Sequence, residues 1–156
     1  MQTKMSTGIV RILILLAAAS VTNAQPFAQL PPTLEGAWNV TITAHGSVLC
    51  TAPEVFSREG TVIADPCSGS QLGVGYGAWI RTGNREFAGT FVGNVYNGTT
   101  GQIIGRYKVT SIGTLQPDGE TLTGVFKTES YDLSGNLINT VSGTLLGKRI
   151  QVEILH

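Results

Sequence analysis

The sequence predicts an all-β protein, an antiparallel up-and-down meander closed into a single small barrel of about eight strands. From Val74 onward, runs rich in threonine and β-branched residues alternate with short spacers rich in glycine and asparagine, a pattern typical of strands joined by hairpin turns. No long window carries the three- and four-residue apolar spacing of an amphipathic helix. A meander of long strands leaves two edges exposed unless its first and last strands pair, which favours a closed barrel.

Residues 1–24 have the features of a cleaved secretory signal peptide. Lys4 and Arg11 supply positive charge, an apolar run follows at Ile12–Ala19, and small residues for a signal peptidase stand at Thr22–Ala24. The run is much shorter than the roughly 20 residues that cross a bilayer, so a membrane anchor is the weaker interpretation. We therefore expect a secreted or periplasmic protein with no membrane association after cleavage.

The remaining chain, residues 25–156, is long enough for one domain with a sizeable core. Its 132 residues carry a formal net charge of −2, and its eight lysines and arginines are scattered. A nucleic-acid-binding face needs clustered basic residues with interleaved aromatics, so we expect no nucleic-acid partner. The sequence leaves the oligomeric state open.

The domain begins with an irregular arm and one clear strand. Residues 25–33, QPFAQLPPT, are too broken by proline for regular structure, and the barrel domain is expected over residues 34–156. In the run 36–44, Trp38, Val40 and Ile42 share one face while polar residues share the other. This alternation predicts a strand with one buried side.

The next region is the least regular. We predict a long crossing loop over residues 45–60, a short strand over 61–64 and a turn-rich segment over 65–73. Cys50 and Cys67, the only cysteines, bracket this region, and an exported chain meets an oxidising compartment. We predict a disulfide, which would stabilise the fold by about 3 kcal/mol. A metal site is the poorer interpretation, because two cysteines without a nearby histidine pair make half a zinc site.

The second half of the chain contains five long strand-like runs. Their spacers combine glycine and asparagine, which tolerate positive φ, or proline followed by Asp-Gly, which fits a tight reversal. Glycine also recurs inside the runs, which indicates that the strands coil sharply or that backbones approach closely in a small barrel. The runs are residues 74–82, 85–96, 102–115, 120–132 and 137–150.

The Gly36-Ala37-Trp38 triplet, together with Arg149 near the end of the last run, resembles the lipocalin and wider calycin pattern. The run GYGAWIRTGNREFAGTF, residues 75–91, also looks like that of secreted bacterial lipocalin-like proteins without an assigned activity. The resemblance implies a barrel in which Trp38 closes one end and Arg149 packs across its ring. A guanidinium stacked on an indole gains roughly 0.5 to 2 kcal/mol. The resemblance also implies that a small hydrophobic ligand is bound.

Few residues offer catalytic chemistry. His45 is expected at the rim and His156 at the chain end, no G-x-S-x-G motif is present, and both cysteines are assigned to the disulfide. The acids are poor candidates, since Glu54 and Asp65 flank the irregular segment and others belong to turns or to solvated faces. We predict no catalytic residue, no metal site and no cofactor.

The alternation of the later strands instead predicts an apolar inner wall with a few hydroxyl groups. Such a wall suits a small apolar ligand oriented by one or two hydrogen bonds, although large side chains can also fill an eight-stranded barrel completely. Trp79 has the opposite parity from Tyr76 and Ile80, so it either packs outside or is turned inward by a bulge. The predicted ligand-binding residues are Tyr76, Phe87, Phe91, Tyr107, Ser111 and Phe126.

These observations favour a secreted, lipocalin-like protein that binds a small hydrophobic molecule. The first alternative is a barrel-type cyclase or isomerase, similar to allene oxide cyclase or dirigent-like proteins. A buried carboxylate or tyrosine pair facing the lumen would favour it. The second is a structural or interaction protein with a filled core, which clustered apolar residues on the outer wall would favour.

Overall fold

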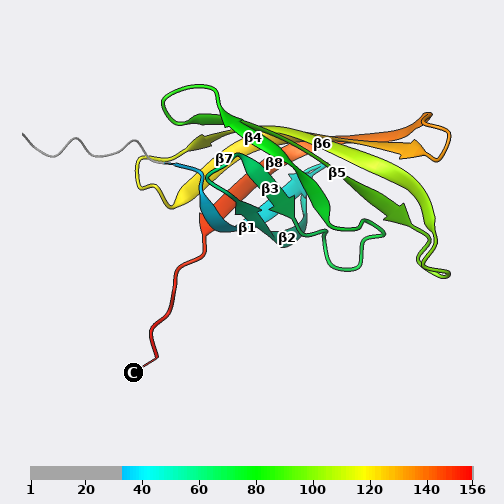
Figure 1. Ribbon diagram of the computed structural model, residues 1–156, viewed down its shortest axis with the longest axis horizontal. Helices are drawn as coiled ribbons and strands as arrows, with labels where there is room; N and C mark the ends of the chain where they lie inside the picture. The colour runs from blue at the N-terminus through cyan, green and yellow to red at the C-terminus, as the bar shows by residue number, and fades with distance from the viewer. Residues whose placement is uncertain (1–32, 156) are drawn as a thin grey trace, which may run out of the picture.

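The computed structural model describes residues 33–155 (Figure 1). The predicted signal peptide, residues 25–32 of the arm and His156 lie outside the described residues. Eight strands follow one another and close into one antiparallel barrel in chain order. They are β1 (Gly36–Ala44), β2 (Ser47–Phe56), β3 (Thr61–Ala64), β4 (Gly75–Arg81), β5 (Glu86–Tyr96), β6 (Ile103–Leu115), β7 (Thr121–Asp132) and β8 (Leu137–Arg149).

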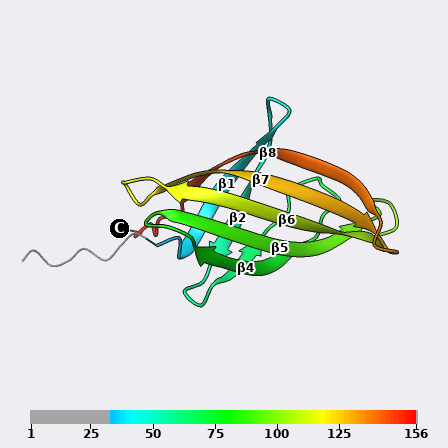
Figure 2. The ribbon, with the colours of Figure 1, turned by 90° about the horizontal axis from the view of Figure 1, so that it is seen from above.

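Pairing of the first strand with the last removes both edges of the sheet. The β1–β8 ladder runs from Trp38↔Arg149 to Ala44↔Gly143. Figure 2 shows the long strands β5 to β8 side by side along one wall, with β1 crossing behind them. The predicted all-β class, the meander and the closure of eight strands are confirmed.

The predicted crossing loop over residues 45–60 is wrong, because most of it is strand β2. His45 and Gly46 both have positive φ, 53° and 75°, and they form the two-residue turn of a β1–β2 hairpin. Pro53, which cannot donate to a ladder, stands just before the short β2–β3 pairing begins at Glu54↔Ala64. The predicted strand over 61–64 is present as β3.

The predicted inward face of β4 is also wrong. Tyr76 and Ile80 are 61% and 63% exposed on the outer wall, and Trp79 points inward without a bulge in the β4–β5 ladder. The indole Nε1–H of Trp79 donates to the carbonyl of Ser57 at 2.9 Å. Its ring packs edge-on against Phe56 and Phe87, with centroid distances of 6.3 and 5.6 Å.

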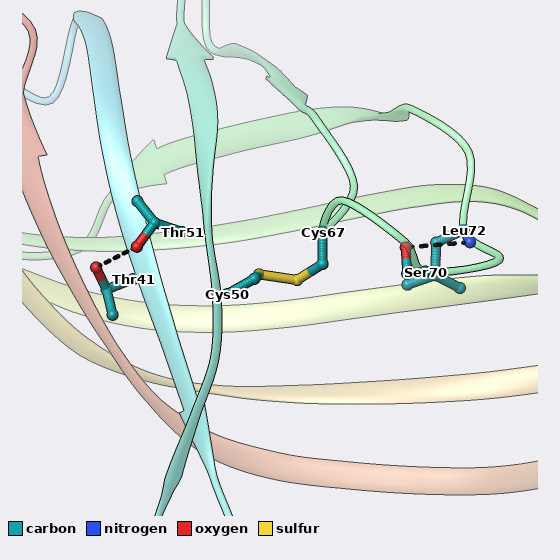
Figure 3. The surroundings of a disulfide bond; sticks show 6 residues. All are labelled: Thr41, Cys50, Thr51, Cys67, Ser70 and Leu72. Atoms are coloured by element: carbon teal, nitrogen blue, oxygen red, sulfur yellow. Dashed lines mark hydrogen bonds between the residues drawn. A yellow bond between two sulfur atoms is a disulfide. The ribbon is translucent and has the colours of Figure 1, made fainter.

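The predicted disulfide between Cys50 and Cys67 is confirmed, with 5.6 Å between the two Cα atoms. It joins β2 to the connection 65–74 between β3 and β4 (Figure 3). The same connection is tied to β5 by a bridge between Leu72 and Val95 and by a hydrogen bond from Tyr96 N–H to the carbonyl of Gln71 at 2.7 Å. The loop is therefore fastened on two sides.

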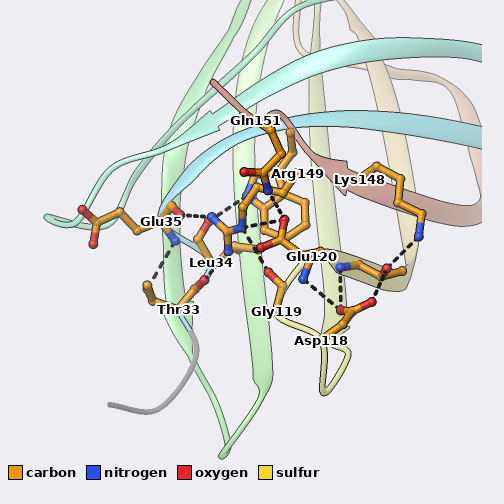
Figure 4. A network of polar contacts seen from close by, with 11 residues as sticks. Thr33, Leu34, Glu35, Asp118, Gly119, Glu120, Lys148, Arg149 and Gln151 are labelled. Carbon is orange, nitrogen blue, oxygen red and sulfur yellow. Dashed lines mark hydrogen bonds and ion pairs between the residues drawn. The ribbon is translucent and has the colours of Figure 1, made fainter. Parts of the chain in front are cut away.

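One end of the barrel, which we call the Trp38 end, is closed by Arg149 and a polar network (Figure 4). The guanidinium carbon of Arg149 lies 4.3 Å from the centroid of the Trp38 ring. The guanidinium donates to the carbonyls of Thr33, Glu35 and Gly119 at 2.9, 2.5 and 3.0 Å. These bonds hold the start of the domain and the β6–β7 turn against the end of β8.

The hydrophobic core fills the Trp38 end of the barrel. Trp38 is fully buried, and its indole N–H donates to the carbonyl of Leu34 at 2.8 Å. Every other buried member of the cluster is also an inward-facing apolar residue. The cluster consists of Leu34, Trp38, Val40, Phe56, Val62, Phe87, Leu115 and Leu122.

Candidate functional site

The other half of the barrel interior is hollow. A cavity of about 290 Å³ lies between the core cluster and the disulfide-bonded connection 65–74. Its wall combines apolar side chains from β1, β5, β6, β7 and β8 with a few polar ones. The lining residues are Val40, Ile42, Leu49, Glu54, Ala64, Asp65, Pro66, Cys67, Leu72, Phe91, Tyr107, Val109, Ser111, Phe126, Thr128, Ser130, Asn139, Val141 and Leu145.

Four of the six predicted ligand-binding residues line this cavity: Phe91, Tyr107, Ser111 and Phe126. They come from β5, β6 and β7 and share the inner face because the side chains of a strand alternate. The rings of Phe91 and Tyr107 meet edge-on, with centroids 6.4 Å apart. The inner faces of β5, β6 and β7 therefore bring these four predicted residues together in one cavity wall.

The other two predicted residues lie elsewhere. Phe87 is 2% exposed and belongs to the core cluster. It lies on β5 four residues before Phe91, which lines the cavity. Tyr76 is on the outer wall, where it pairs with Val92. Arg106 also lies exposed on the outer wall, beside Tyr76 and Val92.

Two glycines make room for the Tyr107 ring. A Cβ at Gly93 would collide with that ring, and a Cβ at Gly75 would lie 2.5 Å from the Phe91 ring and 2.9 Å from the Tyr107 hydroxyl oxygen. The hydroxyl of Tyr107 donates to the carbonyl of Gly73 at 2.6 Å. Because its one proton is used there, its oxygen can only accept a hydrogen bond from a molecule in the cavity.

Glu54 is the group that sequence reasoning missed. It lies on the inner face of β2 with Ala52 and Phe56, and it lines both the cavity and a smaller gap next to the core cluster. Among residues 33–155, no side chain forms a hydrogen bond or an ion pair with its carboxyl group. Burial raises the pKa of Glu54 to about 7. Burial, and then the charge of Glu54, raise the pKa of Tyr107 to about 12.

The charged groups of the cavity wall all have one sign. Glu54 lies inside and Asp65 stands exposed at the rim, while none of the described lining residues is a lysine, arginine or histidine. Ser111, Thr128 and Asn139 add neutral hydrogen-bonding groups. The wall therefore carries acidic and neutral polar groups on an apolar background.

Neither a metal site nor a membrane-spanning helix is found in the part of the chain that the structure describes. Within residues 33–155, no three histidine, cysteine or acidic side chains gather as metal ligands would. No helix over the same residues has the length and apolarity of a membrane span.

Comparisons with known proteins do not extend this description: no family model, no curated protein and no solved structure matches the chain.

Proposed function

We propose that this protein is an exported, lipocalin-like barrel that binds a small, mostly apolar molecule in its interior. The single observation that carries the proposal is the cavity of about 290 Å³. Its volume is at the lower end of the range typical of small-molecule sites, and its wall of aliphatic and aromatic side chains with a few polar groups has the usual composition of such sites. The eight-strand meander and the contact of Arg149 with Trp38 support the lipocalin-like part of the proposal.

Two measurements test this function. Native mass spectrometry of the exported protein should detect a co-purified small molecule. Titration with the neutral fluorescent probe N-phenyl-1-naphthylamine should give saturable binding that Val109→Phe weakens at least tenfold, since Val109 lines the cavity. The matched control is Val125→Phe, because Val125 is 49% exposed on the outer wall. Equal binding by both variants would contradict an interior site.

A cyclase or isomerase is the second candidate, and Glu54 is the specific observation that favours it. A carboxyl group whose pKa is raised to about 7 is suited to accept a proton from one carbon of a bound substrate and return it to another. Such an isomerisation consumes no co-reactant, because the proton removed from one carbon is returned to another. In deuterium oxide, the native protein should exchange a carbon-bound hydrogen of the co-purified molecule, and Glu54→Gln should not.

An interaction role has support from the outer wall but not from the interior. Apolar residues of the outer wall form two cross-strand rows. One row consists of Val55, Ile63, Tyr76 and Val92, and the other of Ile80, the half-buried Ala88, Ile112 and Val125. Exposed rows of this kind are a feature of interaction surfaces. A fully filled core, which this alternative assumed, does not fit the cavity.

A further inference from the structure

The carboxyl group of Glu54 is an unusual component of an apolar cavity, because the described part of the chain provides it with no hydrogen-bonding or ionic partner. No hydrogen bond or ion pair reaches it from residues 33–155. A carboxyl group in such a place either takes up a proton or acquires a cation. The described wall contains no lysine, arginine or histidine that could serve as this cation.

The remaining polar groups of the wall also fit a cationic ligand. Tyr107 can only accept a hydrogen bond from the cavity, because its proton is donated to the carbonyl of Gly73. An ammonium group has three N–H donors and no acceptor, so it complements a carboxylate and a phenolic oxygen. Glu54 and Tyr107 line the same cavity, so both acceptors are available to one bound molecule.

Aromatic rings supply a second contact suited to a cation. Phe91, Tyr107 and Phe126 all line the cavity, and the face of an aromatic ring attracts a cation. By contrast, an anionic amphiphile such as a fatty acid would meet Glu54 inside and Asp65 at the rim with no basic residue to compensate. The same wall therefore disfavours a negatively charged ligand.

We propose that the cavity selects an apolar amine, whose protonated nitrogen pairs with the ionised carboxyl group of Glu54 while its hydrocarbon part lies against the apolar wall. This inference rests on the proposed binding function and names its ligand class. Among the described lining residues, the titratable groups that face the site are Glu54 on β2, Asp65 after β3 and Tyr107 on β6.

Isothermal titration calorimetry with three eight-carbon probes tests the proposal on the exported protein. At pH 8, octylamine should bind at least tenfold more tightly than 1-octanol, and octanoate should bind more weakly than either. Glu54→Gln should reduce octylamine binding to the level of 1-octanol and leave 1-octanol binding unchanged. Glu59→Gln is the matched control and should preserve the preference, because Glu59 is exposed between β2 and β3 and does not line the cavity.

The pH profile of the native protein gives a second readout that needs no variant. As pH falls from 7 to 5, Glu54 takes up a proton while octylamine stays protonated, so octylamine affinity should fall toward that of 1-octanol, by up to about tenfold per pH unit. The affinity of 1-octanol should not fall in this way.

The outcomes separate the two proposals. Equal affinity for octylamine and 1-octanol, an unchanged preference in Glu54→Gln, or tightest binding of octanoate overturns the amine inference and leaves the binding function standing. If none of the three probes binds, and N-phenyl-1-naphthylamine does not bind either, the binding function itself is wrong and the amine inference is lost with it.

Discussion

At the scale of single residues, Glu54 links stability to pH. Its pKa is raised by burial from 4.5 to about 7, so the folded state binds a proton more tightly than the unfolded state does. Proton binding by Glu54 therefore stabilises the folded state. This stabilisation is fully present below pH 4.5 and is lost as pH rises through about 7. The shift corresponds to about 3 kcal/mol of unfolding free energy.

We therefore expect Glu54→Gln to become more stable relative to the native protein as pH rises. Urea denaturation should show the difference in unfolding free energy increasing by about 3 kcal/mol between pH 4 and pH 8 in favour of the variant. Asp65→Asn, altered at an exposed carboxyl group, is the control and should show no comparable trend. A constant difference for Glu54→Gln would mean that the carboxyl group is as well solvated in the folded protein as in the unfolded chain.

The sequence did contain a signal for Glu54, but a weak one. Cys50, Ala52, Glu54 and Phe56 alternate with more exposed residues, and His45-Gly46 is a suitable hairpin turn. Pro53 in the middle of this run indicated a loop, because proline is rare inside a sheet. With the segment predicted as a loop, the sequence makes Glu54 a poor candidate for catalysis. A buried carboxyl group can be located only when the strand that carries it is recognised.

At the scale of elements, β4 shows where alternation alone fails. The run from Gly75 to Arg81 contains large residues on both faces, so the inward face could not be chosen by hydrophobicity. The choice is decided by neighbouring strands, since a Cβ at Gly77 would collide with the backbone of β5 and Trp79 fits between Phe56 and Phe87. In β5 to β7 the inward face was predictable because Phe87, Phe91, Tyr107 and Phe126 share it, although β-branched residues also lie on the outer face.

The connection 65–74 makes a testable contribution to both stability and binding. Replacing both Cys50 and Cys67 with serine should cost about 3 kcal/mol of unfolding free energy, because 17 positions separate the linked residues and the unfolded chain loses its constraint. Denaturant titration measures this loss. Because Pro66, Cys67 and Leu72 form part of the cavity wall, we also expect the neutral probe to dissociate faster from the variant in stopped-flow measurements.

A double variant with native stability would show that the ties from Leu72 and Gln71 to β5 hold the connection without the disulfide. Unchanged dissociation of the probe would show that the ligand does not pass the connection 65–74.

At the scale of the whole molecule, the barrel has two halves with different contents. The sequence predicted the meander and its closure, because hairpin turns and alternation are local patterns. It left open whether the interior is filled or hollow, because that depends on how side-chain volumes from eight strands add up at each level of the barrel. The structure resolves the two alternatives by position: large residues fill the Trp38 end, and smaller ones such as Ser111 and Val141 leave the cavity.

This division predicts opposite effects for two phenylalanines on the same face of β5. Phe87 is buried in the core cluster, whereas Phe91, four residues later, lines the cavity. Phe87→Ala should cost about 3 to 5 kcal/mol of unfolding free energy, the usual loss for a buried aromatic side chain, and should leave probe affinity within about twofold. Phe91→Ala should cost less, because part of the ring already faces empty space, but it should change probe affinity about tenfold by altering the wall. Chemical denaturation and probe titration of both variants provide the comparison. If the two substitutions changed stability and affinity in parallel, the interior would behave as one continuous core, and the separation into a structural half and a binding half would be wrong.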